Sequence, residues 1–222
     1  MTAPSATTET RAAPRAEPVT TPCEGSGRWR QWRAGAGLLS ALAALATVTA
    51  APADATSGSS NGGFETPRVQ PHTFQTLPAG RSIGAWTVTR GTVDLVGEGF
   101  WQAANGAQSL DLNGDTSGAV SQTFSTLPLV KYEIGYKLAG NPGGPPAVKT
   151  GRVRINGEVA RDFSFDATGR SFAGMGYVHQ KVSFVATGLS MTVEFAGTVP
   201  GVFGPVIDDV TVKSCLVIIC HL

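Results

Sequence analysis

Charged residues are scarce in this sequence. They make up 15% of its 222 residues, against about a quarter in an ordinary soluble domain. Long solvent-exposed helices carry charged residues along their outer side, so this scarcity disfavours a helical protein. The net charge of +1 also disfavours nucleic acid as the main partner, because phosphate binding needs a surplus of lysine and arginine.

Sequence motifs of the common enzyme classes are missing as well. There is no G-x-S-x-G nucleophile elbow, no H-E-x-x-H zinc motif and no glycine-rich phosphate loop. The three histidines, His72, His179 and His221, are widely separated and their spacing suggests neither a zinc site nor a catalytic triad. A carboxylate pair for glycoside hydrolysis could still assemble across strands. We nevertheless expect a protein that is not an enzyme.

Long apolar runs are absent, and the most apolar segment lies near the N-terminus. Residues 34–46 (AGAGLLSALAALA) follow a cluster of arginines and precede small residues of the A-x-A type. This pattern predicts a secretory signal peptide over residues 28–55; a membrane anchor, the alternative, needs about 20 apolar residues. Residues 1–27 are expected to be disordered or to precede the true start. Residues 56–222 are then one secreted, extracellular domain with no membrane association after cleavage.

Cysteine is rare, with three in the chain. Cys23 precedes the predicted cleavage site, so only Cys215 and Cys220 remain in the expected mature protein. A close pair of cysteines in an oxidising compartment is typically a disulfide, and two unpaired thiols are the alternative. The expected mature protein carries twelve basic and twelve acidic residues, so its net charge is zero.

Alternating apolar residues are abundant beyond residue 60. Tyr132, Ile134, Tyr136 and Leu138 occupy every second position of one segment, and residues 178–184 show the same pattern. A period of two is typical of strands that bury one face. No segment after the leader sustains a helical period.

Turn signals separate these segments at short intervals. Asn156-Gly157 lies between two alternating runs and predicts a hairpin, because both residues tolerate positive φ. Residues 141–146 (NPGGPP) cannot pair in a ladder, so they are expected to form an exposed loop. About ten short strands with such turns predict an all-β fold, a jelly-roll β-sandwich. Trp86 alternates with Val88 and is expected in its core.

One segment combines a tryptophan with amide and carboxylate side chains, which is typical of sugar-binding sites. An aromatic ring can stack on the C–H groups of a sugar while polar groups bind its hydroxyls. The alternative is that the tryptophan only caps the core. The candidate ligand-binding residues are Trp101, Gln102, Asn105, Asp111 and Asn113.

The two ends of the expected domain carry a second group of acidic residues. Asp208 shares the alternation of Val210 and Val212, which predicts that its carboxylate faces the interior. A buried carboxylate is paired, protonated or bound to a metal. Glu65, Asp208 and Asp209 could hold a structural Ca²⁺; the alternative is a carboxylate hydrogen-bonded to turn amides.

Three ordered motifs carry a family resemblance. They are N-G-x-F-E at residues 61–65, W-Q-A-A-x-G-x-x-S-L-D-L-N-G at 101–114 and G-P-x-I-D-D-V-T-V at 204–212. Over residues 61–213 the chain resembles the choice-of-anchor C family of exported bacterial proteins. That family is similar to a plant cell-wall family of unknown-function domains with a galactose-binding-like jelly roll.

The resemblance implies a non-catalytic extracellular module associated with cell-wall or cell-surface polysaccharide. Related carbohydrate-binding modules often hold a structural Ca²⁺ between a G-F-E and a D-D-V motif, which here match Glu65 and Asp208/Asp209. No C-terminal sorting segment follows Lys213, so we expect release rather than surface attachment.

The leading hypothesis is therefore a secreted, carbohydrate-binding module with a polysaccharide or cell-surface glycan as partner. A structural extracellular domain that binds another protein and has no sugar site is the first alternative. A secreted glycan-active enzyme is the second. Apart from calcium, no cofactor is expected.

Overall fold

A tight turn at Asn156-Gly157 joins two long antiparallel strands, as the sequence predicts. In the computed structural model, which describes residues 60–215, φ is 52° at Asn156 and 88° at Gly157. Two successive positive φ values give a turn whose twist matches that of the flanking strands. The strands β8 (Val148–Ile155) and β9 (Glu158–Asp166) pair across it. The predicted loop at residues 141–146 precedes β8.

Strands are the only long regular elements among the described residues, which include no helix. The other ten strands are β1 (Phe74–Pro78), β2 (Ser82–Ile83), β3 (Trp86–Arg90), β4 (Thr92–Val96), β5 (Ser109–Asp111), β6 (Ala119–Ser125), β7 (Lys131–Gly140), β10 (Val178–Val185), β11 (Ser190–Gly197) and β12 (Pro205–Cys215).

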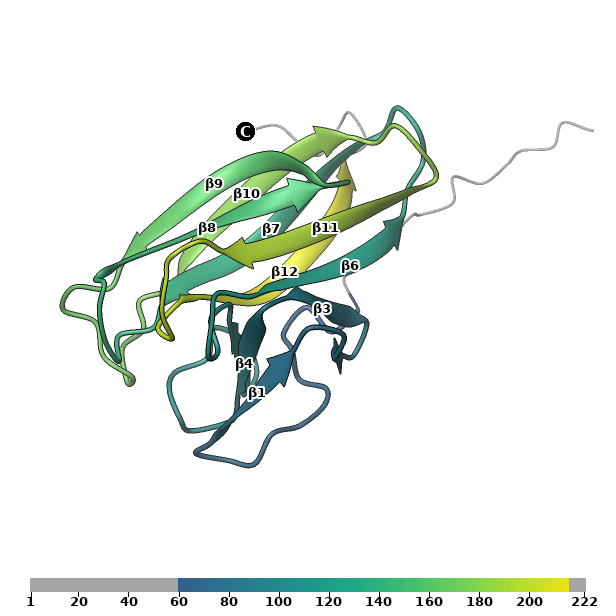
Figure 1. Cartoon of the computed structure of the whole chain (residues 1–222). Coiled ribbons are helices and arrows are strands. Elements are labelled where there is room, and N and C mark those ends of the chain that lie inside the picture. Colours follow the sequence, from purple (N-terminus) through teal and green to yellow (C-terminus); the bar gives the residue numbers. More distant parts are fainter. Residues whose placement is uncertain (1–59, 216–222) are drawn as a thin grey trace, which may run out of the picture. The chain divides into compact units, whose positions relative to one another are not determined.

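The strands form two six-stranded sheets in which every pair is antiparallel (Figure 1). The first sheet, sheet A, has the order β1-β4-β5-β12-β7-β10, and the second, sheet B, has the order β2-β3-β6-β11-β8-β9. Sequential strands alternate between the sheets for much of the chain, which is typical of Greek-key sandwiches. The predicted all-β jelly-roll sandwich is confirmed.

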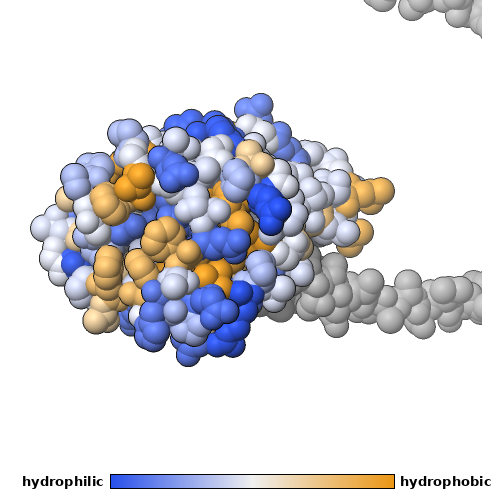
Figure 2. Space-filling view, turned by 60° about the horizontal axis from the view of Figure 1, so that its bottom comes forward, coloured by the Kyte–Doolittle hydropathy of each residue, from blue (hydrophilic) through white to orange (hydrophobic). Residues whose placement is uncertain are grey.

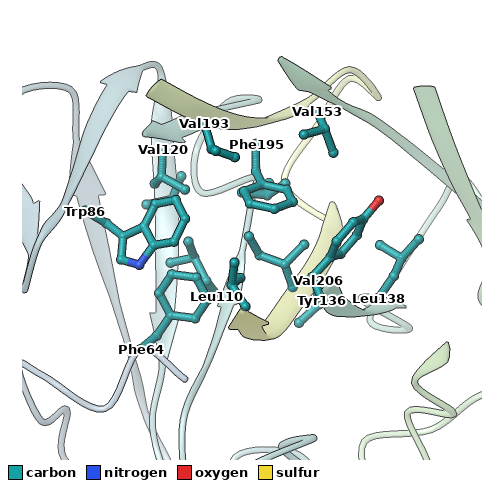
Figure 3. Close-up of a cluster of buried hydrophobic side chains, with 14 of the residues drawn as sticks. Phe64, Trp86, Leu110, Val120, Tyr136, Leu138, Val153, Val193, Phe195 and Val206 are labelled. Carbon is teal, nitrogen blue, oxygen red and sulfur yellow. The ribbon is translucent and has the colours of Figure 1, made fainter. Parts of the chain in front are cut away.

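The core lies between the two sheets and is rich in aromatic side chains (Figure 3). Trp86 is fully buried, which confirms its predicted place. Its ring centroid lies 5.9 Å from that of Phe195, which in turn lies 5.0 Å from Tyr136. These contacts join β3, β11 and β7 and so fasten one sheet to the other, since buried aromatic pairs stabilise a core beyond their burial alone.

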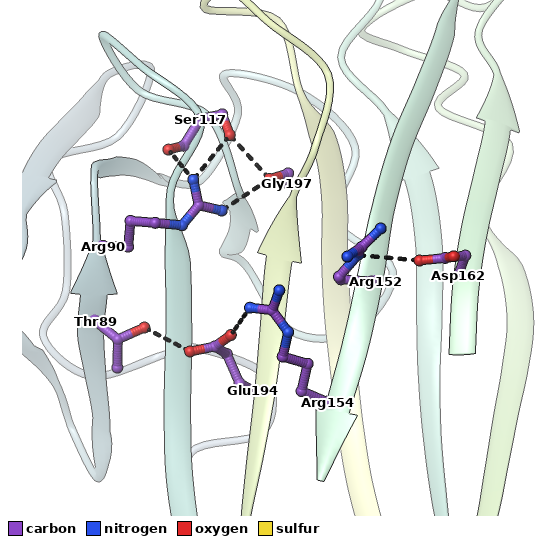
Figure 4. A network of polar contacts seen from close by, with 8 residues as sticks. All are labelled: Thr89, Arg90, Ser117, Arg152, Arg154, Asp162, Glu194 and Gly197. Atoms are coloured by element: carbon purple, nitrogen blue, oxygen red, sulfur yellow. Dashed lines mark hydrogen bonds and ion pairs between the residues drawn. The ribbon is translucent and has the colours of Figure 1, made fainter. Parts of the chain in front are cut away.

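The outer face of sheet B is polar and ties its strands together through arginine side chains (Figure 4). Arg154 on β8 lies 2.9 Å from Glu194 on β11, and Glu194 also accepts a hydrogen bond from Thr89 on β3. Arg152 pairs with Asp162 on β9 at 3.1 Å. These cross-strand pairs suit a face open to water, where each contributes about 1 kcal/mol or less.

Asp208 is buried, as the sequence predicts, but it does not share the inward face of Val212. Asp208 pairs with Lys137, whereas Val212 pairs with Ile134, and the register shifts between Asp208 and Thr211. This bulge changes the alternation, so Asp208 and Val212 lie on opposite faces of sheet A. Asp208 is still fully buried, because a loop covers the outer face of the sheet at this point.

No helix among residues 60–215 is long and apolar enough to cross a membrane. The predicted signal peptide, its cleavage site, Cys23 and Cys220 lie outside the described residues. Cys215 ends β12 and is buried, and its pairing with Cys220 stays a prediction.

Candidate functional site

A cavity of about 290 Å³ lies on the outer face of sheet A, where β1 and β4 pair. Phe74 lies opposite Val96 and Thr76 lies opposite Asp94, so these four side chains share one face. On the other face, Leu77, Val93 and Leu95 are buried in the core. The cavity lining, in chain order, is Phe74, Thr76, Asp94, Val96, Phe100, Trp101, Gly114, Asp115, Asn141, Phe172, Val202 and Phe203.

One wall of the cavity is a cluster of four aromatic rings. The centroid of Phe100 lies 5.5 Å from those of Phe74, Trp101 and Phe172. Phe74 and Phe172 keep 50% and 42% of their surface exposed, so these two rings present aromatic surface to solvent. Exposed aromatic rings that remain clustered are typical of binding surfaces. On the face shown in Figure 2, hydrophobic residues gather between strongly hydrophilic ones.

Trp101 supports this wall from behind. Its side chain is 6% exposed, and its Nε1 donates a hydrogen bond of 2.7 Å to Ser109 Oγ on β5. The ring therefore fastens the loop after β4 to the outer face of sheet A. Trp101 lines the cavity, but its contacts are those of a packed residue, and the rings with exposed surface are Phe74 and Phe172.

Phe203 also lines the cavity and rests on glycines. A Cβ atom added to Gly144 would lie 2.2 Å from the Phe203 ring, and one added to Gly143 would lie 3.0 Å from it. The glycines of the N-P-G-G-P-P loop thus allow close packing of backbone against ring. The buried Lys149 places its Nζ 5.7 Å from the centre of the same ring and donates to Gly144 O at 2.7 Å.

The polar edge of the cavity is acidic. Asp94 accepts a hydrogen bond of 2.6 Å from the hydroxyl of Thr76. Burial, and to a lesser extent the nearby Asp115 carboxylate, raise the pKa of Asp94 despite that bond. Gly114, which precedes Asp115 in the sequence, packs against Asp94, since a Cβ there would lie 3.0 Å from Asp94 Oδ1. The two carboxylates therefore lie at the same edge of the cavity.

Asp111, which the sequence predicts to bind a ligand, is fully buried beneath the cavity. Its carboxylate accepts hydrogen bonds from Asn113 N (2.9 Å), Asn141 Nδ2 (2.8 Å) and Gly204 N (3.4 Å). Burial raises the pKa of Asp111 to about 8 against the lowering effect of these bonds. Asp111 therefore holds the two loops that carry Asn141 and Phe203, and it does not line the cavity.

The remaining predicted ligand residues lie away from the cavity. Asn113 is fully buried, and its Nδ2 donates to Val199 O at 2.9 Å and Gly201 O at 2.7 Å. Gln102 is exposed and borders a separate, open hollow with Lys137 and Tyr177. The Nδ2 of Asn105 donates to Asp209 Oδ1 at 3.1 Å. The structure thus brings only Trp101 of the five predicted residues into the cavity lining.

The three predicted calcium ligands hydrogen-bond to backbone amides and to one side chain. Asp208 Oδ2 accepts from the amides of Ala104 and Asn105, at 2.8 Å and 2.9 Å, and its Oδ1 accepts from Asp209 N at 2.6 Å. Burial is the main reason that the pKa of Asp208 rises to about 7.

Glu65 is bonded in the same way. Its Oε1 accepts from the amides of Ala107 and Gln108 at 2.8 Å and 3.0 Å. Within residues 60–215, no group of three or more His, Cys, Asp or Glu side chains could hold a metal ion. The contacts of Glu65 and Asp208 are those of the amide-bonded alternative, and the structural Ca²⁺ stays a prediction.

Sequence reasoning missed most of the lining. Phe74, Phe172 and Phe203 come from three separate segments, and nothing in their local patterns indicates a shared wall. Asp115 follows the pair Asn113-Gly114, and Asn141 opens the proline-rich loop, so both lie at turn signals in the sequence. Turn residues at the ends of strands are where sandwich proteins place binding groups, and this was the only available signal.

Two facing antiparallel sheets define a β-sandwich module, and the aromatic-walled cavity on one outer face is its candidate site. The chain belongs to the family described as "Protein of unknown function (DUF642)", whose model matches residues 59–213. The match confirms the resemblance to a family of unknown-function domains. Membership of the choice-of-anchor C family stays a prediction.

Solved structures with similar chain paths include several carbohydrate-binding modules. One is a family 35 module from Clostridium thermocellum (13% identity, 64% of this chain and 99% of that chain covered, TM-score 0.45). A second is TmCBM61 in complex with beta-1,4-galactotriose (17% identity, 70% of this chain and 96% of that chain covered, TM-score 0.43). A third is the CBM22-1 xylan-binding domain from Paenibacillus barcinonensis Xyn10C (15% identity, 66% of this chain and 96% of that chain covered, TM-score 0.43). With TM-scores below 0.5, these similarities carry no argument about the ligand of this chain. No curated protein matches the chain.

Proposed function

We propose that this protein is a non-catalytic carbohydrate-binding module that acts outside the cell on cell-wall or cell-surface polysaccharide. The observation that carries the proposal is the pairing of the exposed rings of Phe74 and Phe172 with the carboxylates of Asp94 and Asp115 around one cavity. Sugars offer apolar C–H faces and hydroxyl donors at the same time, so they need both kinds of group within a few ångströms.

The geometry supports binding rather than hydrolysis. Asp94 and Asp115 lie at the same edge of the cavity, close enough for the charge of one to raise the pKa of the other. Glycoside hydrolysis needs two carboxylates that flank the scissile bond. Asp111, whose pKa is raised furthest among the nearby carboxyls, is buried beneath the cavity and does not line it.

The extracellular setting is proposed from the sequence. The signal-peptide pattern at residues 28–55 and the pair Cys215 and Cys220 both suit export. Polysaccharides of the wall or surface are the glycans that an exported module meets first.

The test is binding of the purified protein to galactan, xylan, cellulose and chitin, followed by truncation of the exposed rings. We expect Phe74→Ala and Phe172→Ala each to weaken binding to the best glycan by about tenfold, since one stacked ring contributes roughly 1–1.5 kcal/mol. Leu189→Ala is the matched control, because Leu189 is 73% exposed and does not line the cavity. Trp101→Ala is a poor probe, since removal of a buried tryptophan costs about 3–5 kcal/mol of stability.

Equal binding by the Phe74→Ala, Phe172→Ala and Leu189→Ala variants would contradict the proposed site. Release of reducing sugars from the bound glycan, lost in Asp94→Asn, would contradict the non-catalytic role.

A further inference from the structure

The charged residues of the cavity lining have one sign. Asp94 and Asp115 are both acidic, and none of the twelve lining residues is lysine, arginine or histidine. Asp94 is partly buried between Thr76 and Gly114, so its charge is screened by water less than that of an exposed carboxylate. A ligand that enters the cavity meets negative charge at its polar edge.

Lys149 and Arg170, on segments that border the lining, are engaged elsewhere. Lys149 lies behind Phe203, is fully buried and donates to Gly144 O at 2.7 Å. Arg170 lies over the ring of Phe165, 5.8 Å from its centre. Neither residue lines the cavity, so neither offers a partner to an acidic group bound there.

Two arginines on the opposite sheet are paired as well. Arg152 and Arg154 on the outer face of sheet B lie at 3.1 Å and 2.9 Å from Asp162 and Glu194 (Figure 4). An anionic ligand would have to displace these carboxylates before it could bind the arginines. Neither the cavity lining nor these two arginines therefore offer an unpaired cation to an acidic ligand.

We propose that the cavity selects glycans that carry no carboxylate or sulfate, with Asp94 and Asp115 as the specificity-determining residues. A neutral hexose can donate its hydroxyl hydrogens to the two carboxylates, whereas a uronate would place its own negative charge beside them in a partly desolvated site. The inference rests on the proposed sugar binding and deepens it, because it names the chemical class of the sugar.

The experiment compares one polymer in two charge states. Galactan and β-glucan are each tested as the neutral polymer and after selective oxidation of the C6 hydroxyl to a carboxylate, which leaves the backbone unchanged. We expect the protein to bind the neutral form at least tenfold more tightly at low salt, and the ratio to shrink as sodium chloride screens the repulsion.

Charge-removing variants assign the selectivity to the two residues. We expect Asp94→Asn combined with Asp115→Asn to reduce the ratio to about threefold or less, because most of the negative charge at the edge is gone. Glu158→Gln is the matched control, since Glu158 is an exposed carboxylate in the β8–β9 hairpin and not in the lining, and it should keep the wild-type ratio. Asp115→Asn alone, at an exposed turn position, keeps the test valid if the double variant does not fold.

The outcomes separate the two proposals. Equal or tighter binding of an oxidised polymer, or an unchanged ratio in the Asp115→Asn and double variants, overturns the charge selection while leaving sugar binding in place. The panel also includes xylan and chitin. If no polymer of the panel binds, in either charge state, the proposed function is overturned and the selectivity with it.

Discussion

Among single residues, Asp111 has the largest structural role beneath the cavity. It is fully buried, yet it accepts hydrogen bonds from the segments that carry Asn113, Asn141 and Gly204. Truncation of a buried acceptor with several donors leaves those donors unpaired, which costs about 1–3 kcal/mol for each group. Asp111 therefore fixes the positions of the segments that form the cavity, although it does not line the cavity itself.

The raised pKa of Asp111 predicts a pH dependence of stability. The folded protein holds this proton up to about pH 8, whereas an unfolded aspartate releases it near the ordinary value of 3.8. Because the folded state binds more protons between these values, the contribution of Asp111 to the free energy of unfolding is fully present below the lower value. It is lost as pH rises towards the upper one, by up to about 1.4 kcal/mol per pH unit.

Chemical unfolding of the wild type and of Asp111→Asn at pH 5, 6 and 7 measures this effect. We expect the difference in the free energy of unfolding, wild type minus variant, to decrease steadily as pH rises, since the variant lacks the titrating carboxyl group. Asp162→Asn serves as the control, because Asp162 lies on the exposed outer face of β9, and its difference should stay nearly constant. A constant difference for Asp111→Asn would contradict the prediction.

At the scale of elements, local signals in the sequence predicted the turns and the buried faces of strands, because neighbouring residues determine both. The Asn156-Gly157 pair fixes a two-residue turn, because both residues accept positive φ, and the alternation of β7 fixes which of its faces is buried. The bulge in β12 was not predictable in this way. It places Asp209 at a φ of 49°. The bulge depends on how β12 pairs with β5 and β7 and on a covering loop, and all of these are distant in sequence.

The turn between β8 and β9 offers a direct test at this scale. Gly157 has a φ of +88°, and no atom lies within 4 Å of an added Cβ, so the cost of Gly157→Ala comes from backbone conformation alone. We expect a loss of about 1–2 kcal/mol in the free energy of unfolding, measured by urea denaturation.

Gly188→Ala provides the comparison for this variant. Gly188 also has open surroundings, its nearest neighbour being Ser190 O at 3.8 Å, and its φ is outside the left-handed region. Its substitution should change stability by about 0.5 kcal/mol or less. Equal losses in the two variants would mean that the hairpin does not depend on its positive φ.

At the scale of the whole molecule, the candidate site was the least predictable feature. Its aromatic wall joins β1, the loop after β4 and the loop before β10, through Phe74, Phe100 and Phe172. Each of these residues looks locally like any other apolar residue in a strand or loop. Trp101 was identified because tryptophan beside glycine and amide side chains is informative alone, but only the tertiary fold shows which rings keep an exposed face.

Hydrogen bonds to one loop connect the two ends of the described domain. Glu65 near the start and Asp208 in the last strand both accept amide hydrogens from residues 104–108. Charged acceptors bonded to backbone amides contribute more than neutral ones, about 1.5–3 kcal/mol each when well shielded. One loop therefore holds the two ends of the described domain together.

This closure by hydrogen bonds predicts that the fold does not depend on calcium. The oxygens of Glu65 and Asp208 already receive amide hydrogens, so we expect the melting temperature to stay within about 1 °C when a chelator or excess Ca²⁺ is added, because only a ligand of the native state shifts it. Glu65→Gln should lower the melting temperature by weakening two charge-assisted bonds, whereas Glu158→Gln should not. A rise of several degrees with Ca²⁺ in the wild type, absent in Glu65→Gln, would instead establish the calcium site predicted from the sequence and show that the carboxylates exchange amide partners for the ion.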